Sequence, residues 1–279
     1  MVVAVTAATA AASVLQGVAA PSARAVGCPD AEVLFARGTT EDPGPGPTGS
    51  AFIDALRSKV GDKTLGVYSI DYPATMDFAT AVDGIADARS HILATAATCP
   101  DTKMVLGGFS QGAAVMGFVT ANAIPDGVDP ATVPAPLPPD IANHVAAVAL
   151  FGKPSARFMR VINDPSITVG PQYVAKTVDL CVDDDLVCDP TGRSFSAHNE
   201  YFDAGMVEKG AAFAANALRV SWLTDSQAPP PAGTHLTPSP TAPGPLTPAS
   251  PASPLGPLPG PVIVASAPAP VASVPAPVV

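Results

Sequence analysis

A serine flanked by glycines is the first feature of this 279-residue sequence that could do chemistry. The segment Gly108-Phe-Ser-Gln-Gly112 lies between a predicted strand, residues 104–109, and a predicted helix that begins near residue 111. A serine on a strained strand-to-helix turn projects its hydroxyl above the sheet, and the glycines on either side let the two backbones pack closely. The adjacent helix N-terminus would also favour negative charge on a reacting group. The pattern therefore predicts that Ser110 is a nucleophile.

A nucleophilic serine needs a base, and in this setting the acid and then the histidine follow it along the chain. Three histidines lie after Ser110. His144 directly precedes an apolar strand, at the wrong end of a parallel sheet, and His235 lies in a proline-rich stretch that cannot hold a catalytic geometry. His198 lies in a polar loop between the last predicted strand and the last predicted helix, where sites on such sheets form. Elimination favours His198 as the base.

The acid that would orient this base is expected among Asp183, Asp184 and Asp185, which lie between Cys181 and Cys188. A run of three aspartates is also typical of a solvated turn or of loose Ca²⁺ ligands. Composition does not choose among the three residues.

The elements that must position these residues are short apolar strands alternating with helices. Such near-continuous apolar strands predict a five-stranded parallel sheet with helices on both faces, a three-layer α/β fold. Ser50 is expected to cap the first helix. The predicted strands are 32–36, 66–70, 104–109, 145–151 and 174–180, and the predicted helices are 51–60, 79–97, 111–123 and 203–220.

Two proline-rich segments interrupt this pattern. Residues 124–140 contain too much proline for a helix and are expected to form a surface excursion. No large lid is expected over the site unless this excursion folds across it. Residues 226–279 hold 17 of the 34 prolines and no Asp, Glu, Lys or Arg, which is typical of a disordered or polyproline-II tail. Such a tail would act as a spacer, with possible cell-wall association.

The first 25 residues are expected to be a signal peptide, because they are rich in Ala, Val and Thr and end in Ala23-Arg24-Ala25, an export-type cleavage site. The alternative is a short hydrophobic anchor. The basic residues that usually open a signal peptide are missing, which suggests that translation starts further upstream. Residues 26–225 would then form the folded domain, with no transmembrane span.

Composition limits the partners. A net charge of −10 argues against nucleic acid, which needs clustered Lys and Arg. Four cysteines fit two disulfides in an oxidising compartment, and spacing pairs Cys181 with Cys188, which leaves Cys28 with Cys99. No metal and no cofactor are expected, because C-x-x-C pairs are absent and histidine is scarce.

Four segments, in the same order, resemble the cutinase family. The resemblance covers roughly residues 28 to 222 and is closest to actinobacterial members. The segments are Phe35-Ala-Arg-Gly-Thr-Thr-Glu41, Gly107-Gly-Phe-Ser-Gln-Gly-Ala113, Leu150-Phe-Gly152 and the Cys181 to Cys188 loop with its Asp185-Leu-Val-Cys ending.

This resemblance implies an α/β-hydrolase fold and makes Asp185 the acid of the triad. It also implies that the backbone N–H groups of Thr39 and Gln111 form the oxyanion hole. Family members often carry Ser where this chain has Thr39, whose extra methyl would narrow the pocket or stiffen the rotamer. The family's two disulfides match the pairing reached from spacing.

The sequence thus predicts a secreted, monomeric serine esterase acting on lipid-like esters, with Met76, Phe78 and Phe195 near the acyl chain. The natural ester stays open among cutin, phospholipid, triacylglycerol and wall lipids. One alternative is a non-catalytic surface or adhesion protein that displays the proline-rich tail on an esterase scaffold. Another is acyl transfer or peptide cleavage by the same residues.

Overall fold

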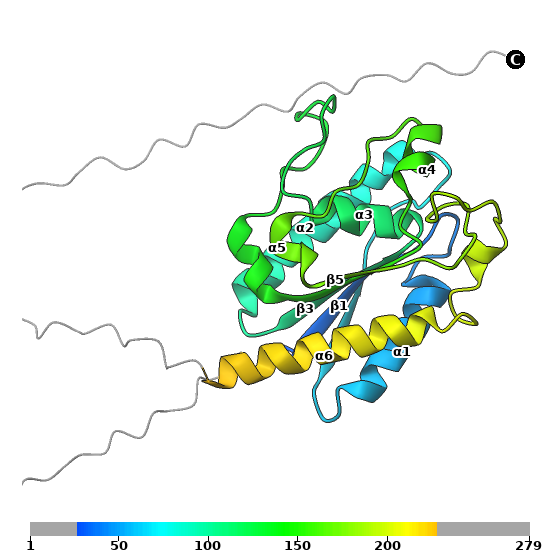
Figure 1. Ribbon diagram of the computed structural model, residues 1–279. Coiled ribbons are helices and arrows are strands. Elements are labelled where there is room, and N and C mark those ends of the chain that lie inside the picture. Colours follow the sequence, from blue (N-terminus) through cyan, green and yellow to red (C-terminus); the bar gives the residue numbers. More distant parts are fainter. Residues whose placement is uncertain (1–26, 228–279) are drawn as a thin grey trace, which may run out of the picture. The chain divides into compact units, whose positions relative to one another are not determined.

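A five-stranded parallel sheet forms the centre of the described part of the chain, residues 27–227 of the computed structural model (Figure 1). The strand order is β2-β1-β3-β4-β5. All neighbouring strands are parallel, so the predicted five-stranded parallel sheet is confirmed. The strands are β1 (Ala31–Ala36), β2 (Leu65–Ser69), β3 (Lys103–Phe109), β4 (Val145–Phe151) and β5 (Thr177–Leu180).

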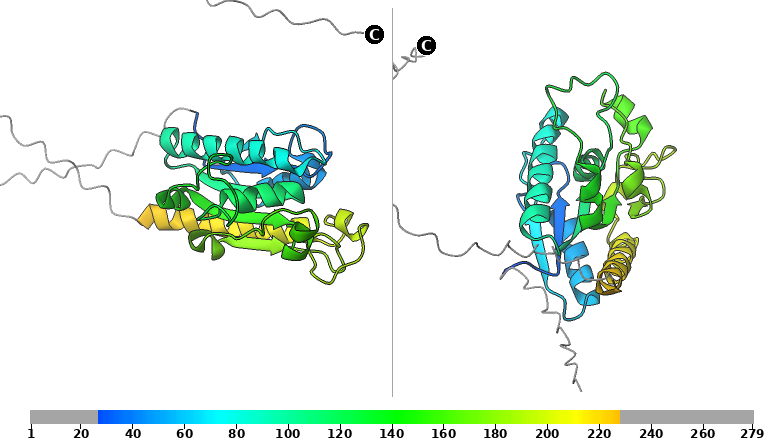
Figure 2. Two further views of the ribbon diagram at one scale, coloured as in Figure 1. Left: turned by 90° about the horizontal axis from the view of Figure 1, so that it is seen from above. Right: turned by 90° about the vertical axis from the view of Figure 1, so that its left-hand side faces the viewer.

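Helices cover both faces of this sheet, as the sequence predicts (Figures 1 and 2). The α-helices are α1 (Gly46–Lys59), α2 (Ala81–Thr98), α3 (Gln111–Val119), α4 (Ala156–Val161), α5 (Pro171–Val174) and α6 (Met206–Gln227). Three short 3₁₀ helices are η1 (Phe78–Thr80), η2 (Pro139–His144) and η3 (Ala197–Asn199).

The central strands are mostly apolar because each contributes to two cores. Successive side chains of a strand point to opposite faces. Val33 and Phe35 pack in the core beneath α1 and α6, whereas Leu34 and Ala36 pack in the core beneath α2 and α3. All seven residues of β3 and all seven of β4 are buried. Because β3 is the middle strand of the sheet, its carboxyl end and Ser110 after it lie at the middle of the sheet edge.

The first helix begins earlier than predicted, and Ser50 does not cap it. Gly46 is the first helical residue and Pro45 occupies the cap position. Pro47 lies in the first turn, where a missing N–H costs nothing and a fixed φ favours the helix. Ser50 is therefore inside the helix, and the prediction of a cap there was wrong.

Two other predicted boundaries were wrong. Val174 belongs to the one-turn helix α5, which Pro171 opens, and β5 begins only at residue 177. The helix after Ser110 ends at Val119 and not at residue 123. At this end the Thr120 hydroxyl donates to the carbonyls of Met116 and Gly117. Those bonds satisfy acceptors at the helix end.

The last helix, α6, runs from residue 206 to 227 and is longer than the predicted 203–220. Its end is tied to the start of the sheet, because Trp222 Nε1 donates to the carbonyl of Asp30 at 3.4 Å and Lys103 pairs with Asp225 at 2.8 Å. Of the described residues, none belongs to a helix both long and apolar enough to cross a bilayer. The predicted signal peptide and the proline-rich tail from residue 228 lie outside the described residues.

A disulfide joins Cys28, just before β1, to Cys99, at the end of α2, as the spacing predicts. The two cysteines lie 71 residues apart in sequence. The bond lies at the amino end of the sheet, opposite the edge that carries Ser110.

Replacing Cys28 and Cys99 with Ser should therefore lower stability more than activity. Under the chain-entropy treatment, closing this loop is worth about 4.4 kcal/mol, so Tm should fall by roughly 10–15 °C. Calorimetry gives Tm, and ester hydrolysis well below Tm gives kcat. A variant that loses most of its kcat while keeping its Tm would contradict this expectation.

Candidate active site

Ser110 lies on the turn between β3 and α3 with φ of 54° and ψ of −117°. A non-glycine residue with positive φ is strained, and such strain concentrates at functional sites. A Cβ on Gly108 would collide with the Gly112 carbonyl, and one on Gly112 would collide with the Ala36 carbonyl. The two glycines therefore allow the close backbone approach that this turn requires. Ser110 N–H donates to the carbonyl of Phe151 at 2.8 Å and fixes the turn to β4.

The structure brings Ser110, His198 and Asp185 into one chain of hydrogen bonds. Ser110 Oγ lies 2.8 Å from His198 Nε2, and His198 Nδ1 lies 2.7 Å from Asp185 Oδ2. Asp185 is fully buried and His198 is 4% exposed. The Phe109 ring stacks on the imidazole at 5.0 Å between centroids. His144 lies elsewhere, with Nδ1 3.1 Å from the carbonyl of Pro100.

The Asp185 carboxylate is held by three donors. Besides His198, Val187 N–H donates to Oδ1 at 2.8 Å and the Tyr201 hydroxyl donates to Oδ2 at 2.6 Å. Burial by itself would raise the pKa of Asp185, but the hydrogen bonds from His198, Tyr201 and Val187 together hold it below its ordinary value. The carboxylate is therefore charged and fixed in orientation.

The other two aspartates of the run are exposed and point elsewhere. Asp184 has φ of 64°, and its carboxylate accepts the N–H of Arg193 at 2.9 Å. This bond braces the turn that carries Asp185. The geometry thus separates the three residues that composition alone could not.

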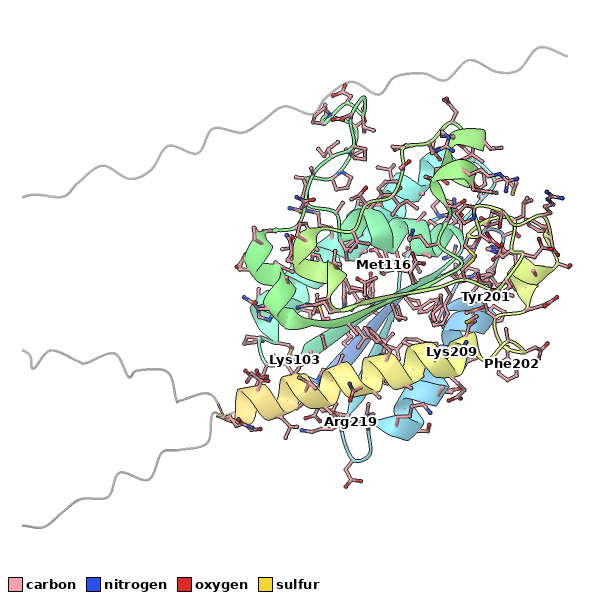
Figure 3. The ribbon with its side chains drawn as sticks, viewed as in Figure 1. Lys103, Met116, Tyr201, Phe202, Lys209 and Arg219 are labelled. Carbon is pink, nitrogen blue, oxygen red and sulfur yellow. A yellow bond between two sulfur atoms is a disulfide. The ribbon has the colours of Figure 1, made fainter. Side chains whose placement is uncertain are left out.

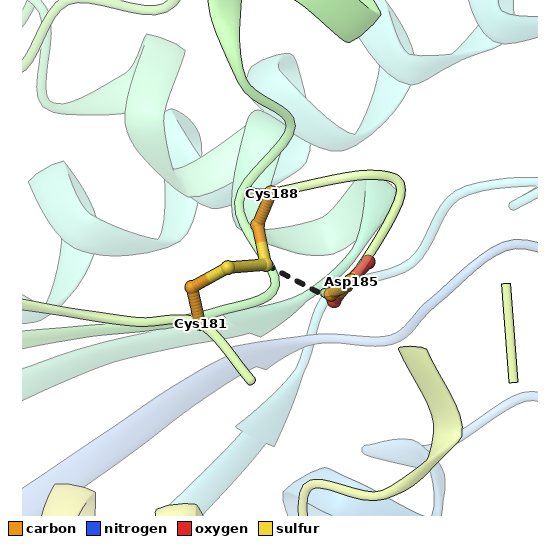
Figure 4. A group of neighbouring side chains, drawn as sticks. All are labelled: Cys181, Asp185 and Cys188. Carbon is orange, nitrogen blue, oxygen red and sulfur yellow. Dashed lines mark hydrogen bonds between the residues drawn. A yellow bond between two sulfur atoms is a disulfide. The ribbon is translucent and has the colours of Figure 1, made fainter. Parts of the chain in front are cut away.

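A second disulfide, between Cys181 and Cys188, closes the loop around Asp185 (Figure 4). The Cys188 sulfur lies 3.0 Å from Asp185 Oδ2. Although Cys181, Asp185 and Cys188 group their ligand-type atoms within 4.8 Å, the sulfurs are bonded to each other and offer no thiolate to a metal. The group instead restrains the loop.

Tyr201 is a residue of this site that the sequence reasoning missed. It is buried, follows His198 by three positions, and comes from the loop before α6, while its neighbour Phe202 is 71% exposed (Figure 3). Burial and the bond to Asp185 raise the pKa of Tyr201, so its hydroxyl keeps its proton and donates. The spacing His198-x-x-Tyr201 was the signal available in the sequence.

Gly152, at the end of β4, makes room for both rings. Its φ is 62°, and a Cβ there would lie 2.8 Å from His198 Cε1 and 2.8 Å from the Tyr201 hydroxyl. A side chain at this position would push the imidazole away from Ser110. This explains the glycine that ends the Leu150-Phe-Gly152 segment.

The loop after β1 is braced by a buried arginine. Arg37 Nε donates to the carbonyl of Glu41 at 2.9 Å, and its terminal nitrogens donate to the carbonyls of Ile70 and Tyr72. The Glu41 carboxylate accepts Gly38 N–H at 2.6 Å, and burial raises the pKa of Glu41. These bonds fix the backbone on both sides of Thr39.

Thr39 and Gln111 lie beside Ser110 in the wall of one cavity of about 600 Å³. Gln111 is the first residue of α3, where backbone N–H groups have no acceptor within the helix. The hydrophobic residues expected near an acyl chain, Met76, Phe78 and Phe195, line the same cavity. Met76 is 69% exposed and Phe195 61%, so both lie at the cavity mouth.

The sequence profile described as Cutinase matches residues 27–218. The chain belongs to the cutinase family. Probable carboxylesterase Culp5 of Mycobacterium tuberculosis is 59% identical over 174 residues, which cover 62% of this chain and 99% of that protein. Phospholipase Culp4 of the same organism is 43% identical over 214 residues, 77% of this chain and 90% of that protein.

Solved structures agree with this assignment. An acetyl xylan esterase superposes with a TM-score of 0.56 at 25% identity, covering 68% of this chain and 99% of that chain. A Trichoderma reesei cutinase in complex with a phosphonate inhibitor gives 0.51 at 31% identity, covering 68% and 77%. The present chain is therefore an α/β-hydrolase and a carboxylic ester hydrolase.

Tyr201→Phe should lower kcat about tenfold with little change in KM, because the hydroxyl touches the carboxylate and not the cavity. The depressed pKa of Asp185 contributes stability that is present above its unfolded value of about 3.9 and is lost as pH falls through the folded value. Losing the Tyr201 donor reduces that contribution. The Tm difference between the two proteins should therefore be largest near neutral pH and shrink below pH 4.

Melting curves from pH 3 to 7 and Michaelis–Menten kinetics at pH 7 check both parts. A Tm difference independent of pH, with kcat unchanged, would mean that the hydroxyl contributes only to packing. Phe202→Leu serves as a control, since Phe202 is exposed beside it.

Replacing Cys181 and Cys188 with Ser should lower kcat sharply while the protein remains folded. Closing this short loop is worth only about 2.5 kcal/mol, but an orienting carboxylate must be held to within about half an ångström. The assay is kcat at a temperature below the variant's own Tm. The opposite result, with this pair affecting Tm more and the Cys28–Cys99 pair affecting kcat more, would contradict the catalytic role assigned to the Cys181–Cys188 loop.

Proposed function

We propose that this member of the cutinase family is a secreted serine esterase that hydrolyses esters of lipid-like acyl chains through Ser110, His198 and Asp185. The observation that carries the proposal is the hydrogen-bond chain at 2.8 and 2.7 Å, which begins at a serine in a strained strand-to-helix turn. Nucleophile, base and orienting acid are thus within reach of one another in the order that acyl transfer requires.

In the first step the Ser110 hydroxyl attacks the ester carbonyl carbon while His198 Nε2 takes its proton. The Asp185 carboxylate holds the Nδ1–H tautomer and stabilises the imidazolium that forms. The protonated imidazole then gives its proton to the leaving alcohol, which leaves an acyl group on Ser110. Water, activated by His198, attacks this acyl-enzyme and releases the acid.

The tetrahedral intermediates carry negative charge on the former carbonyl oxygen. The backbone N–H groups of Thr39 and Gln111 are proposed to donate to this oxygen, because the two residues line the cavity beside Ser110. Removing one such donor typically costs about 10²–10³ in kcat. The bracing of the Thr39 loop by Arg37 and Glu41 supports a preorganised site.

A lipid-like acyl chain is proposed because the cavity that contains Ser110 is walled mostly by aliphatic and aromatic side chains. Pockets of about 300–1,000 Å³ with apolar walls and a few polar groups are typical of small-ligand sites. A phospholipase among the relatives supports a lipid ester.

Secretion is proposed from the two disulfides, since such bonds persist in oxidising compartments. The sequence at residues 1–25 supports export. The proline-rich residues 226–279 would link the folded part to the cell wall.

A fluorophosphonate probe tests this function. Wild-type protein should be labelled covalently at Ser110 and should hydrolyse p-nitrophenyl butyrate. Ser110→Ala should lose labelling, and Ser110→Ala, His198→Ala and Asp185→Ala should each lower kcat by several orders of magnitude. The losses should be strongly non-additive.

Asp183→Ala is the matched control and should keep kcat near the wild-type value. Asp183 is exposed, whereas Asp184 accepts a hydrogen bond and has positive φ. Folded wild-type protein that neither reacts with the probe nor hydrolyses the ester would favour the non-catalytic surface protein instead.

A further inference from the structure

The proline-rich excursion after α3 forms a wall of the cavity that contains Ser110. We call residues 121–136 the strap. It arches above α2 and α3 and spans the gap between α2 and α4 (Figures 1 and 2). The sequence predicts a surface excursion over residues 124–140, and several residues of that segment also line the cavity that contains Ser110.

The strap has an apolar side and a polar side, although it has no regular secondary structure. Its polar residues, Asn122, Asp126, Asp129 and Thr132, are exposed and are not among the cavity walls. Its half-buried apolar residues line the cavity, and these are Ile124, Pro125, Val128, Val133, Pro134 and Pro136. This division is what a segment covering an apolar ligand requires.

Most of the remaining cavity walls are apolar as well, although Glu41, Arg89 and Asp164 also line the cavity. Val82 and Ile85 come from α2, Phe118 comes from the end of α3, and Phe158 and Met159 come from α4. Ser110 and His198 line the same cavity. An acyl chain attached to Ser110 would therefore meet mostly apolar walls as it extends away from the catalytic end.

Three features hold the strap in place. Arg89 Nε, from α2, donates to the carbonyl of Ala135 at 2.7 Å. Leu137, just after the strap, is buried among the residues of the core above the sheet. Four prolines, at 125, 130, 134 and 136, also fix φ and limit the conformations of the segment.

We propose that the strap is the specificity-determining wall of an acyl chamber, so that the enzyme prefers long acyl chains and chain length is set by Val128 and Val133. This rests on the proposed function and extends it. Each methylene that the chamber removes from water should raise kcat/KM about fourfold, the change that about 0.8 kcal/mol gives.

The test compares p-nitrophenyl butyrate with p-nitrophenyl decanoate, both below the concentrations at which they aggregate. Wild-type enzyme should show the higher kcat/KM for decanoate. Val133→Trp and Val128→Trp should each lower the decanoate-to-butyrate ratio at least tenfold, because an indole ring displaces two or more methylenes. Melting curves and fluorophosphonate labelling confirm that the variants are folded with a reactive Ser110.

Ala131→Trp is the matched control. Ala131 lies two residues before Val133, is exposed and does not line the cavity. The decanoate-to-butyrate ratio of this variant should therefore equal that of the wild type. An unchanged decanoate-to-butyrate ratio in both Val128→Trp and Val133→Trp would overturn the proposal. It would indicate that the acyl chain binds instead on the exposed side of the cavity, at Met76 and Phe195. The proposed function would fail separately, by loss of butyrate hydrolysis and of labelling in the wild type.

Discussion

The left-handed backbone of Ser110 is the constraint on which the rest of the site depends. This conformation is held because the turn is connected to β3 and α3 and hydrogen-bonded to β4. It also requires Gly108 and Gly112, since a Cβ at either position would collide with a neighbouring carbonyl. Such strain costs of the order of 1–3 kcal/mol and must be offset by the surrounding core. The fully buried β3 and β4 supply that core.

Support for the imidazole is built outward in layers from this turn. Asp185 fixes His198, and Asp185 is itself fixed by Val187, Tyr201 and the disulfide loop. The Asp185 carboxylate pairs with the imidazole, and Val187 N–H and the Tyr201 hydroxyl donate to the carboxylate in turn. A buried carboxylate requires such partners. We expect the two disulfides to serve stability and chemistry separately, since the Cys28–Cys99 bond lies at the amino end of the sheet and the Cys181–Cys188 bond at the carboxyl end.

Most of the fold could be predicted because the central strands β3 and β4 are buried on both faces. The boundaries of 145–151 were predicted correctly from an unbroken apolar run. The errors arose where two local signals competed. The first helix, for example, begins near Pro47, which favours the first turn, and not after Ser50, which was expected to cap it. The proximity of Ser110 and His198 was expected from motif order, and that of Asp185 from the family resemblance. Tyr201 was not expected, because its sequence position gives no sign that it differs from an ordinary core tyrosine. The apolar side of the strap could not be predicted, because a segment without regular secondary structure has no regular spacing of apolar residues.

The strap leaves α3 and returns to β4 without pairing with any strand. Its length and its apolar residues can therefore diverge among relatives without moving the turn that holds Ser110. Under the proposal, insertions in this one connection would change the range of accepted esters without altering the residues that carry the reaction. The same independence makes the strap the segment to exchange when chain-length preference is to be engineered.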